Sequence, residues 1–313
     1  MNTDGNVLLT GATGTIGSAI LEVLSECGRY RVDCIIRHRA DIAYVEANGA
    51  TPIVGDMTDP AIRQRVPLNR EYDYIIHAAQ EHYSTHTDEQ IDRADSAAIA
   101  VLQAIASKRT KMMVYTSGVW IFGDSKTAPI TENTSRRPFL AACRREKLMR
   151  DLERQDRYPW LHICPPSIVY GTRGPLARIV DELKQGPINI IDDEEVLWSV
   201  IERIDLAKAY LAVLKYGTRG DFYVVAEDSP VSQVAFYEKI ARLIPGCEIN
   251  RRPLEYFRLS KKAWQLETLY GSQVVDSTNL KDRTGWRAET VFESWIQTNI
   301  RAMVGTNTAR VRQ

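Results

Sequence analysis

Short apolar runs alternate along this chain with longer stretches in which apolar residues recur every three or four positions. The short runs predict buried strands at 6–10, 31–36, 51–55, 72–78, 111–116, 160–164 and 221–226. The longer stretches predict helices at 88–107, 205–216 and 231–243. Because strands and helices alternate, we expect an α/β fold with a doubly wound parallel sheet, whose ligands bind beyond the carboxyl ends of the strands.

The most informative stretch is 5–24, where a strand, a glycine-rich turn and a helix follow one another. Gly11, Gly14 and Gly17 have the spacing G-x-x-G-x-x-G. Gly11 allows a tight turn, Gly14 lets a pyrophosphate approach the backbone, and Gly17 lets the helix pack closely on the strand. Free N–H groups at the start of the helix attract phosphates. The stretch predicts a dinucleotide site, and a glycine-rich turn of no such function is the alternative.

The end of the second strand indicates which dinucleotide binds. About 20 residues beyond the glycines, an NAD site carries an acidic residue for the ribose. This chain has Arg37 there, followed by His38 and Arg39. A guanidinium binds a 2′-phosphate, whereas a carboxylate repels it, and Asp33 lies too early in the strand to reach the ribose. The pattern favours NADP(H) over NAD, with a solvated basic loop as the alternative.

Composition and charge narrow the class of protein. The 313 residues include 40 basic and 40 acidic ones, and 44% are hydrophobic. This balance indicates a globular protein with a sizeable core and gives no support for nucleic acid or an anionic membrane as a partner. No apolar run reaches the length of a membrane span and no signal segment is evident, so we expect a cytoplasmic protein. Five scattered cysteines lack the spacing of a disulfide framework or a zinc site, and no metal is expected.

Several motifs at the predicted strand ends resemble the extended short-chain dehydrogenase/reductases, also called the NAD-dependent epimerase/dehydratase family. They are GATGTIG at 11–17 and the segments 55–57, 77–79, 115–123, 165–171 and 205–207, in family order. The resemblance spans residues 7 to about 210 and implies a Rossmann fold that binds a nicotinamide dinucleotide. Together with Arg37, it implies cofactor contacts from Gly11, Thr13, Gly14, Thr15, Ile16, Gly17, Asp56, Met57, Ala78, Ala79, Thr116, Pro165, Ser167 and Ile168.

The resemblance also implies how the chain is divided and what it binds. We expect a Rossmann domain of residues 1–170 and 196–228, and a smaller, mostly helical substrate-binding domain of residues 171–195 and 229–313. The family's partners are small-molecule substrates, and dimerisation through helices such as 88–107 and 139–154 would give a homodimer. A small carbonyl or hydroxyl compound is favoured over a nucleotide sugar, because no array of residues for a second diphosphate is evident.

The catalytic residues are where the chain departs from the family. Its members usually transfer a proton with a tyrosine whose pKa is lowered by a lysine four residues on. None of the 14 tyrosines of this chain has a lysine at that spacing. The family pattern places Phe139 at the tyrosine and Cys143 at the lysine, and the usual serine falls at Gly118, one residue after Ser117. An atypical branch of the family lacks the pair and has a downstream glutamate, here Glu146.

Three interpretations of the missing tyrosine–lysine pair stay open. The first is an NADP(H)-dependent oxidoreductase that uses another acid. The second is a non-redox isomerase, cyclase or lyase on the same scaffold. The third is an NADP(H)-binding regulatory protein without catalysis.

The polar loop after the fourth predicted strand offers replacement acids. Tyr83 and His82 lie in it, and in the family this loop faces the nicotinamide, although such loops are often only solvated. Ser117 is a candidate oxyanion donor or substrate anchor, or a hydroxyl that satisfies the strand end. Glu146 is a candidate general acid or base. Cys143 beside two arginines could be a thiolate nucleophile or a small packing residue.

Overall fold

The computed structural model describes residues 4–67, 70–81, 85–126, 128–193 and 195–305. It contains a parallel sheet with the strand order β11-β6-β5-β4-β1-β2-β3. The strands are β1 (Gly5–Thr10), β2 (Tyr30–Ile36), β3 (Thr51–Val54), β4 (Tyr74–His77), β5 (Met112–Thr116), β6 (Trp160–Cys164) and β11 (Phe222–Val224). The chain order reverses between β1 and β4, and in such sheets the reversal marks the place where ligands bind. The doubly wound sheet predicted from the sequence is confirmed.

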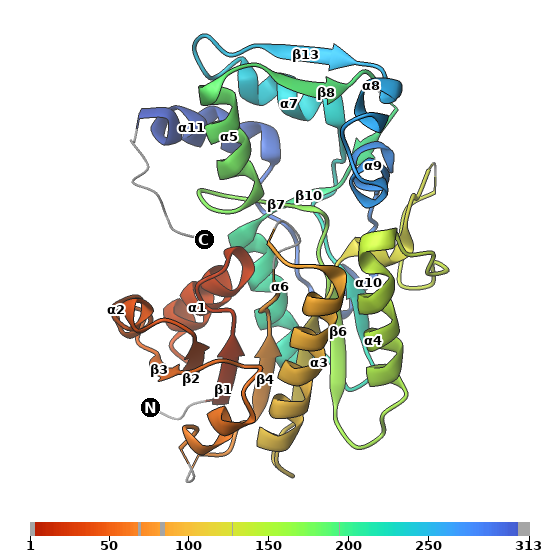
Figure 1. Cartoon of the computed structure of the whole chain (residues 1–313). Helices are drawn as coiled ribbons and strands as arrows, with labels where there is room; N and C mark the ends of the chain where they lie inside the picture. The colour runs from red at the N-terminus through yellow and green to blue at the C-terminus, as the bar shows by residue number, and fades with distance from the viewer. Residues whose placement is uncertain (1–3, 68–69, 82–84, 127, 194, 306–313) are drawn as a thin grey trace.

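Helices cover both faces of this sheet (Figure 1). One face packs on α1 (Thr15–Cys27), α2 (Ile42–Ala47), α6 (Arg203–Tyr216) and α10 (Thr278–Thr284), and the other on α3 (Asp88–Ile105) and α4 (Cys143–Glu153). Successive strand residues alternate between the two cores: Leu9 lies in the first and Leu8 in the second. Short 3-10 turns occur at Arg39–Asp41, Pro60–Gln64, Val119–Phe122 and Leu140–Ala142. The helix expected at 139–154 therefore begins four residues later, after the last of these turns.

A third hydrophobic core lies outside the seven-stranded sheet, in the upper part of Figure 1. Its helices are α5 (Pro175–Gln185), α7 (Gln233–Ala241) and α11 (Phe292–Gly305), with α8 (Leu254–Arg258) and α9 (Ala263–Tyr270) beside them. Three small sheets join this region: β7 (Ile168–Tyr170) with β10 (Val200–Glu202), β9 (Leu197–Trp198) with β12 (Val231–Ser232), and β8 (Ile188–Ile191) with β13 (Ile249–Arg252). The sequence pattern predicts the helix at 231–243, which is α7, and gives the rest of this region only as mostly helical. It misses these strands of two to four residues. The proposed domain boundaries stay a prediction.

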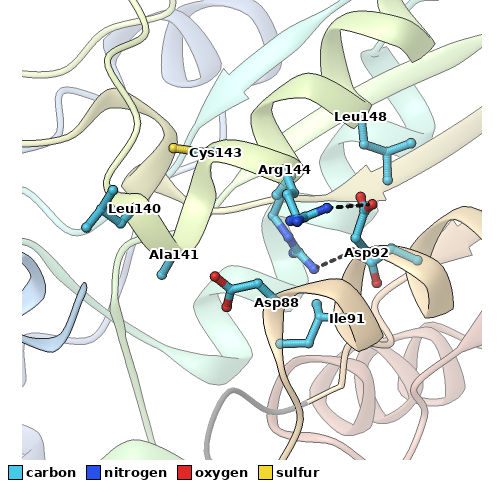
Figure 2. Close-up of a pocket in the computed structure, with 10 residues that line it drawn as sticks. Asp88, Ile91, Asp92, Leu140, Ala141, Cys143, Arg144 and Leu148 are labelled. Atoms are coloured by element: carbon cyan, nitrogen blue, oxygen red, sulfur yellow. Dashed lines mark hydrogen bonds and ion pairs between the residues drawn. The ribbon is translucent and has the colours of Figure 1, made fainter. Parts of the chain in front are cut away.

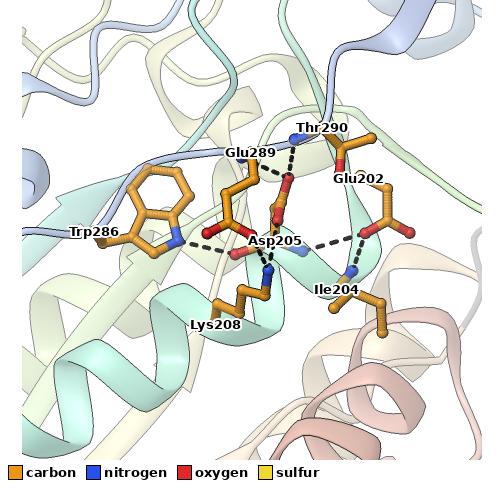
Figure 3. Close-up of polar contacts among 7 residues, drawn as sticks. All are labelled: Glu202, Ile204, Asp205, Lys208, Trp286, Glu289 and Thr290. Carbon is orange, nitrogen blue, oxygen red and sulfur yellow. Dashed lines mark hydrogen bonds and ion pairs between the residues drawn. The ribbon is translucent and has the colours of Figure 1, made fainter. Parts of the chain in front are cut away.

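A buried carboxylate ties the C-terminal segment to the start of α6 (Figure 3). Asp205, 1% exposed, accepts hydrogen bonds from the backbone N–H groups of Glu289 at 2.9 Å and Thr290 at 2.7 Å. The Trp286 indole donates to the Asp205 carbonyl at 3.0 Å. The Glu202 carboxylate caps the helix by accepting from the backbone of Ile204 and of Asp205 itself. The segment 286–290 is thereby fixed against the start of α6.

Candidate functional site

The turn between β1 and α1 requires glycine at two positions. Gly11 has φ +75°, and a Cβ added there would lie 2.6 Å from the carbonyl group of Ala78. A Cβ on Gly17 would lie 2.0 Å from the Gly11 carbonyl oxygen. Only glycine allows the turn and the helix to approach each other and β4 this closely. The roles predicted for Gly11 and Gly17 agree with this geometry.

Gly14 differs from its two neighbours, because its position faces open space. A Cβ added at Gly14 would meet only the Gly11 oxygen, at 3.4 Å. The first N–H groups of α1, from Thr15 and Ile16, follow directly, so the turn fits the pyrophosphate of a dinucleotide. Gly174 lies against Thr15 at this turn, because a Cβ added to Gly174 would lie 2.5 Å from the Thr15 hydroxyl oxygen. No local pattern in the sequence points to Gly174, which lies far along the chain.

Arg37 lies directly after β2, as predicted, between two carboxylates. Its side chain is 46% exposed, forms an ion pair with Glu81, and lies with Nε 4.0 Å from an oxygen of Asp56. Burial favours the neutral form of Asp56, but hydrogen bonds from Thr58 and the nearby Arg37 outweigh burial and lower the pKa of this carboxyl. A 2′-phosphate at Arg37 therefore competes with Glu81 for the guanidinium.

Asp33, which the sequence analysis excluded from the ribose site, lies inside the protein. It is fully buried in β2 and accepts hydrogen bonds from Arg70 and from the Tyr72 hydroxyl at 2.7 Å. Its carboxylate is occupied by structural partners. Arg37 is thus the charged residue at the end of β2.

The residues at the end of β4 lie next to the glycine turn. Ala78 and Ala79 are half-buried there, and Met57 is buried after β3. His77 is 2% exposed and hydrogen-bonded through Nδ1 to the Thr10 hydroxyl at 2.8 Å. Burial lowers the pKa of His77 to about 4, so its imidazole is neutral near pH 7.

The candidate acids after β4 are only partly placed. His82 and Tyr83 lie outside the described residues, so their roles stay predictions. On either side of them, Glu81 is mostly buried at Arg37, and the Nε2 atom of His86 lies 3.7 Å from the Glu81 carboxylate. In the described part of the chain, no group of three His, Cys, Asp or Glu residues could hold a metal ion.

The residues at the end of β5 form hydrogen bonds with α6 and β6. The Thr116 hydroxyl is hydrogen-bonded to the Tyr210 hydroxyl at 2.7 Å. Ser117 is 7% exposed, its backbone N–H donates to Ile163 at 2.8 Å, and its side chain neighbours the Cys164 thiol. Burial raises the pKa of Cys164 to about 12, so this thiol stays protonated. Ser117 is positioned as a neutral hydroxyl rather than as an acid or base.

Phe139 and Cys143, where the sequence predicts the counterparts of the family's tyrosine and lysine, do not form a pair. Phe139 precedes α4 and is buried, with its ring against Gly271, where an added Cβ would lie 2.3 Å from the ring. Cys143 is exposed, and its Sγ donates to the Phe139 carbonyl at 3.5 Å. Burial and the nearby carboxylates of Glu267 and Glu146 raise the pKa of this thiol. The raised pKa argues against the thiolate alternative for Cys143, and its exposure argues against the alternative of a small packing residue.

Glu146 points from α4 toward the sheet, and its charge is balanced by arginines. It is 6% exposed, pairs with Arg150 one turn along the helix, and lies 3.9 Å from Arg136. Along α4, Glu146 is buried together with Met149 and Leu152. The two guanidiniums hold this carboxylate in place.

A buried ion pair under the strand ends was missed in the sequence. Arg145 on α4 donates to the carboxylate of Asp95 on α3 at 2.8 Å and to the carbonyl of Thr116 at 3.2 Å. The Tyr115 hydroxyl also donates to Asp95, at 3.4 Å. The pair forms the inner wall of a cavity of about 80 Å³ between α3 and α4, where Arg144 on the outer rim pairs with Asp92 (Figure 2). Asp95 stands on the apolar face of its helix, a signal that could have revealed it.

The segment after β6 meets two other parts of the chain. Pro165 is buried and its carbonyl accepts from Val119 at 3.1 Å, while Ile168 begins β7. The Trp120 indole donates to the Ser167 hydroxyl at 2.5 Å, and this hydroxyl donates to Oε1 of Gln273. Gln273 comes from the segment after α9 and was not predicted, because its distance along the chain leaves no local pattern.

Comparison with known proteins fits this geometry. Residues 7–226 match the model of the NAD dependent epimerase/dehydratase family. The chain belongs to this family. The predicted resemblance is confirmed, and a nicotinamide dinucleotide is the cofactor after which the family is named.

The individual relatives are distant. A probable UDP-arabinose 4-epimerase of Oryza sativa subsp. japonica is 28% identical over 159 residues, which cover 47% of this chain and 38% of that protein. An uncharacterized protein of Schizosaccharomyces pombe is 22% identical over 73% of this chain and 78% of its own length. The chain thus spans well under half the length of the plant relative, whose activity is not carried over.

Solved structures share the fold over almost the whole chain. UDP-glucose 4-epimerase of Thermus thermophilus, in complex with NAD, has a TM-score of 0.77 at 18% identity and covers 96% of this chain and 99% of its own. The enzyme of Bifidobacterium longum, in complex with NAD+ and UDP, has a TM-score of 0.76 at 18% identity, with 96% and 97% covered. In the described part of the chain, no helix has the length and apolar character that a membrane span needs.

Proposed function

We propose that this protein is an NADP(H)-dependent oxidoreductase that acts on a small carbonyl or hydroxyl compound without the family's tyrosine–lysine pair. The observation that carries the cofactor choice is the half-exposed guanidinium of Arg37 at the end of β2, where an NAD site needs a carboxylate. The glycine turn would hold the pyrophosphate, and Asp56 and Met57 would flank the adenine. The bound dinucleotide supplies the hydride chemistry.

The chain's own residues would bind and orient the reactants. Ser117 offers a neutral hydroxyl beside β5, Glu146 a carboxylate held by arginines, and His77 a neutral buried imidazole. Burial keeps the His77 imidazole neutral near pH 7. Tyr83 and His82 are the candidate general acids of this proposal.

A net non-redox reaction is the second candidate, and the names of the relatives favour it, since several are epimerases. An NADP(H)-binding regulatory role is the third. An assay that follows product and nicotinamide absorbance together separates them. Turnover with stoichiometric NADPH oxidation supports a reductase, product without it supports an isomerase or lyase, and binding without any product supports regulation.

The cofactor choice is tested by calorimetric titration of the wild-type protein with NADPH and NADH. We expect tighter binding of NADPH, and Arg37→Ala should remove about tenfold to a hundredfold of that preference. Arg39→Ala is the matched control, because Arg39 is an exposed arginine two residues away. Equal wild-type affinities would contradict NADP(H) specificity.

A cytoplasmic location and a homodimer through α3 and α4 also belong to this proposal. The exposed rims of both helices are charged, with Arg144 pairing to Glu89 and Asp92, so such an interface would be polar and salt-sensitive. Sedimentation at low and high salt measures the oligomeric state.

A further inference from the structure

Three uncharged side chains meet beyond the carboxyl ends of β5 and β6. Trp120 follows β5 by four residues, Ser167 follows β6 by three, and Gln273 arrives from the segment after α9. An indole N–H can only donate, so the Ser167 oxygen accepts from Trp120 and its hydrogen goes to Oε1 of Gln273. This chain of hydrogen bonds fixes the orientation of the Gln273 amide.

The amide nitrogen of Gln273, at the end of this series of hydrogen bonds, has no partner in the described part of the protein. Gln273 is 3% exposed, and in the described part of the chain its Nε2 atom is buried with no hydrogen-bond partner. The Gln273 backbone is also held in place, because its N–H donates to the Leu197 carbonyl at 2.7 Å and its carbonyl accepts from the Ser199 N–H at 2.8 Å. A buried donor that is held in place and left unpaired calls for an acceptor from a ligand.

We propose that Gln273 is a substrate-binding residue whose amide nitrogen donates to an uncharged oxygen, a carbonyl or a hydroxyl, of the substrate. This inference rests on the proposed function, because it takes the strand ends of the sheet as the substrate site. Trp120 and Ser167 are positioning residues that act through Gln273. The structure thereby assigns a specificity determinant to the C-terminal segment.

The charges near this donor favour a neutral ligand oxygen. None of the three side chains is charged, so none of them offers a positive charge to balance an anionic ligand. A carboxylate or phosphate would be buried here without a counter-charge from these side chains, whereas a carbonyl or hydroxyl oxygen needs only a hydrogen-bond donor.

The test compares Gln273→Met, which keeps the side-chain volume and removes the donor, with Gln233→Met as the matched control. Gln233 is also buried, at 1% exposure, but its Nε2 already donates to Leu269 at 2.8 Å. The probes are two pairs of neutral and charged compounds: glyceraldehyde with glyceraldehyde 3-phosphate, and benzaldehyde with 4-carboxybenzaldehyde. Binding is measured by calorimetry and by thermal shift, with and without NADPH.

We expect a neutral member of at least one pair to bind more tightly than its charged partner. Gln273→Met should weaken that binding by roughly five- to twentyfold, and Gln233→Met should leave it within about twofold. Gln273→Glu, a second variant of similar size, should also weaken the neutral probe, which keeps the test valid if the methionine variant is unstable.

Tighter binding of the charged members, unchanged binding in both Gln273 variants, or no binding of any probe to the folded wild-type protein would each overturn the inference. The dinucleotide titration on the same samples is independent of this result. If neither dinucleotide binds, the proposed function fails, while the effect of Gln273 on the probes can still be measured.

Discussion

The dinucleotide turn and the start of α4 lie at the same edge of the sheet, yet they are built in opposite ways. At the turn, the geometry depends on backbone atoms, as the close approaches of Gly11 and Gly17 show. At the start of α4, it depends on side chains that reach across elements, such as Arg145 to Asp95, 50 residues earlier. A backbone-built site needs particular glycines at fixed spacing, whereas a side-chain-built site can exchange its residues while the fold stays the same.

The largest expected effect concerns the buried ion pair between Arg145, at the start of α4, and Asp95. Arg145→Met leaves the Asp95 carboxylate, 5% exposed, without its main counter-charge. Breaking a buried pair typically costs about 3–5 kcal/mol of unfolding free energy. Urea unfolding of the wild-type and variant proteins measures the loss.

The control for this prediction is Arg144→Met on the same helix. Arg144 pairs with Glu89 and Asp92 at the surface, with its own side chain 48% exposed, and such pairs are worth about 0–1 kcal/mol. Equal losses in the two variants would show that the Arg145–Asp95 pair carries no special weight.

The glycine turn gives the next effect and separates folding from binding. In Gly17→Ala, the new methyl group meets backbone atoms that cannot move aside, so we expect about 1–3 kcal/mol of destabilisation together with loss of dinucleotide binding. In Gly14→Ala, the methyl group projects into open space, so stability should stay within about 0.5 kcal/mol while dinucleotide affinity falls. Calorimetry and urea unfolding measure the two properties separately. Equal loss of stability in both variants would contradict the division of roles among these glycines.

His77 lies between the two regions and gives an effect that depends on pH. Burial holds its pKa at about 4 in the folded protein, against 6.5 for an ordinary histidine, so unfolding takes up a proton between these values. Its stabilising contribution is present above pH 6.5 and is lost as the pH falls toward 4. We expect His77→Gln to remove about 1–3 kcal/mol of this acid sensitivity. The measurement is the free energy of unfolding from pH 4 to 8, with exposed His38→Gln as the control; parallel curves for His77→Gln and the wild type would contradict it.

The comparison of the two regions also explains what could be predicted from the sequence. The strands of the main sheet and the glycine turn follow from local patterns, and the structure places them within a few residues of the prediction. The sequence predicts a helix that begins at Phe139, because the family's motif aligns there. In the structure a 3-10 turn occupies Leu140–Ala142, so α4 begins only at Cys143. Gln273 and Gly174 reach the site only through tertiary packing, which no periodicity encodes. Asp95 could have been found, since an acid on the apolar face of a helix needs a buried partner.

The smallest expected effect tests whether the dinucleotide region is built from backbone alone. Arg37 is the side chain there that would choose between the two dinucleotides, and it is already paired with Glu81, whose side chain is 14% exposed. A 2′-phosphate must displace this carboxylate to pair fully with the guanidinium, so the ion pair reduces NADPH affinity more than NADH affinity. Glu81→Gln keeps the shape and removes the competing charge. We expect NADPH to bind about two- to tenfold more tightly and NADH to change by less than about twofold, as measured by calorimetry. Asp59→Asn is the control, because Asp59 is an exposed carboxylate that accepts from the backbone of Ala61. A parallel gain for both dinucleotides in Glu81→Gln would mean that Arg37 does not meet the 2′-phosphate, and that cofactor choice in this region is set by the backbone.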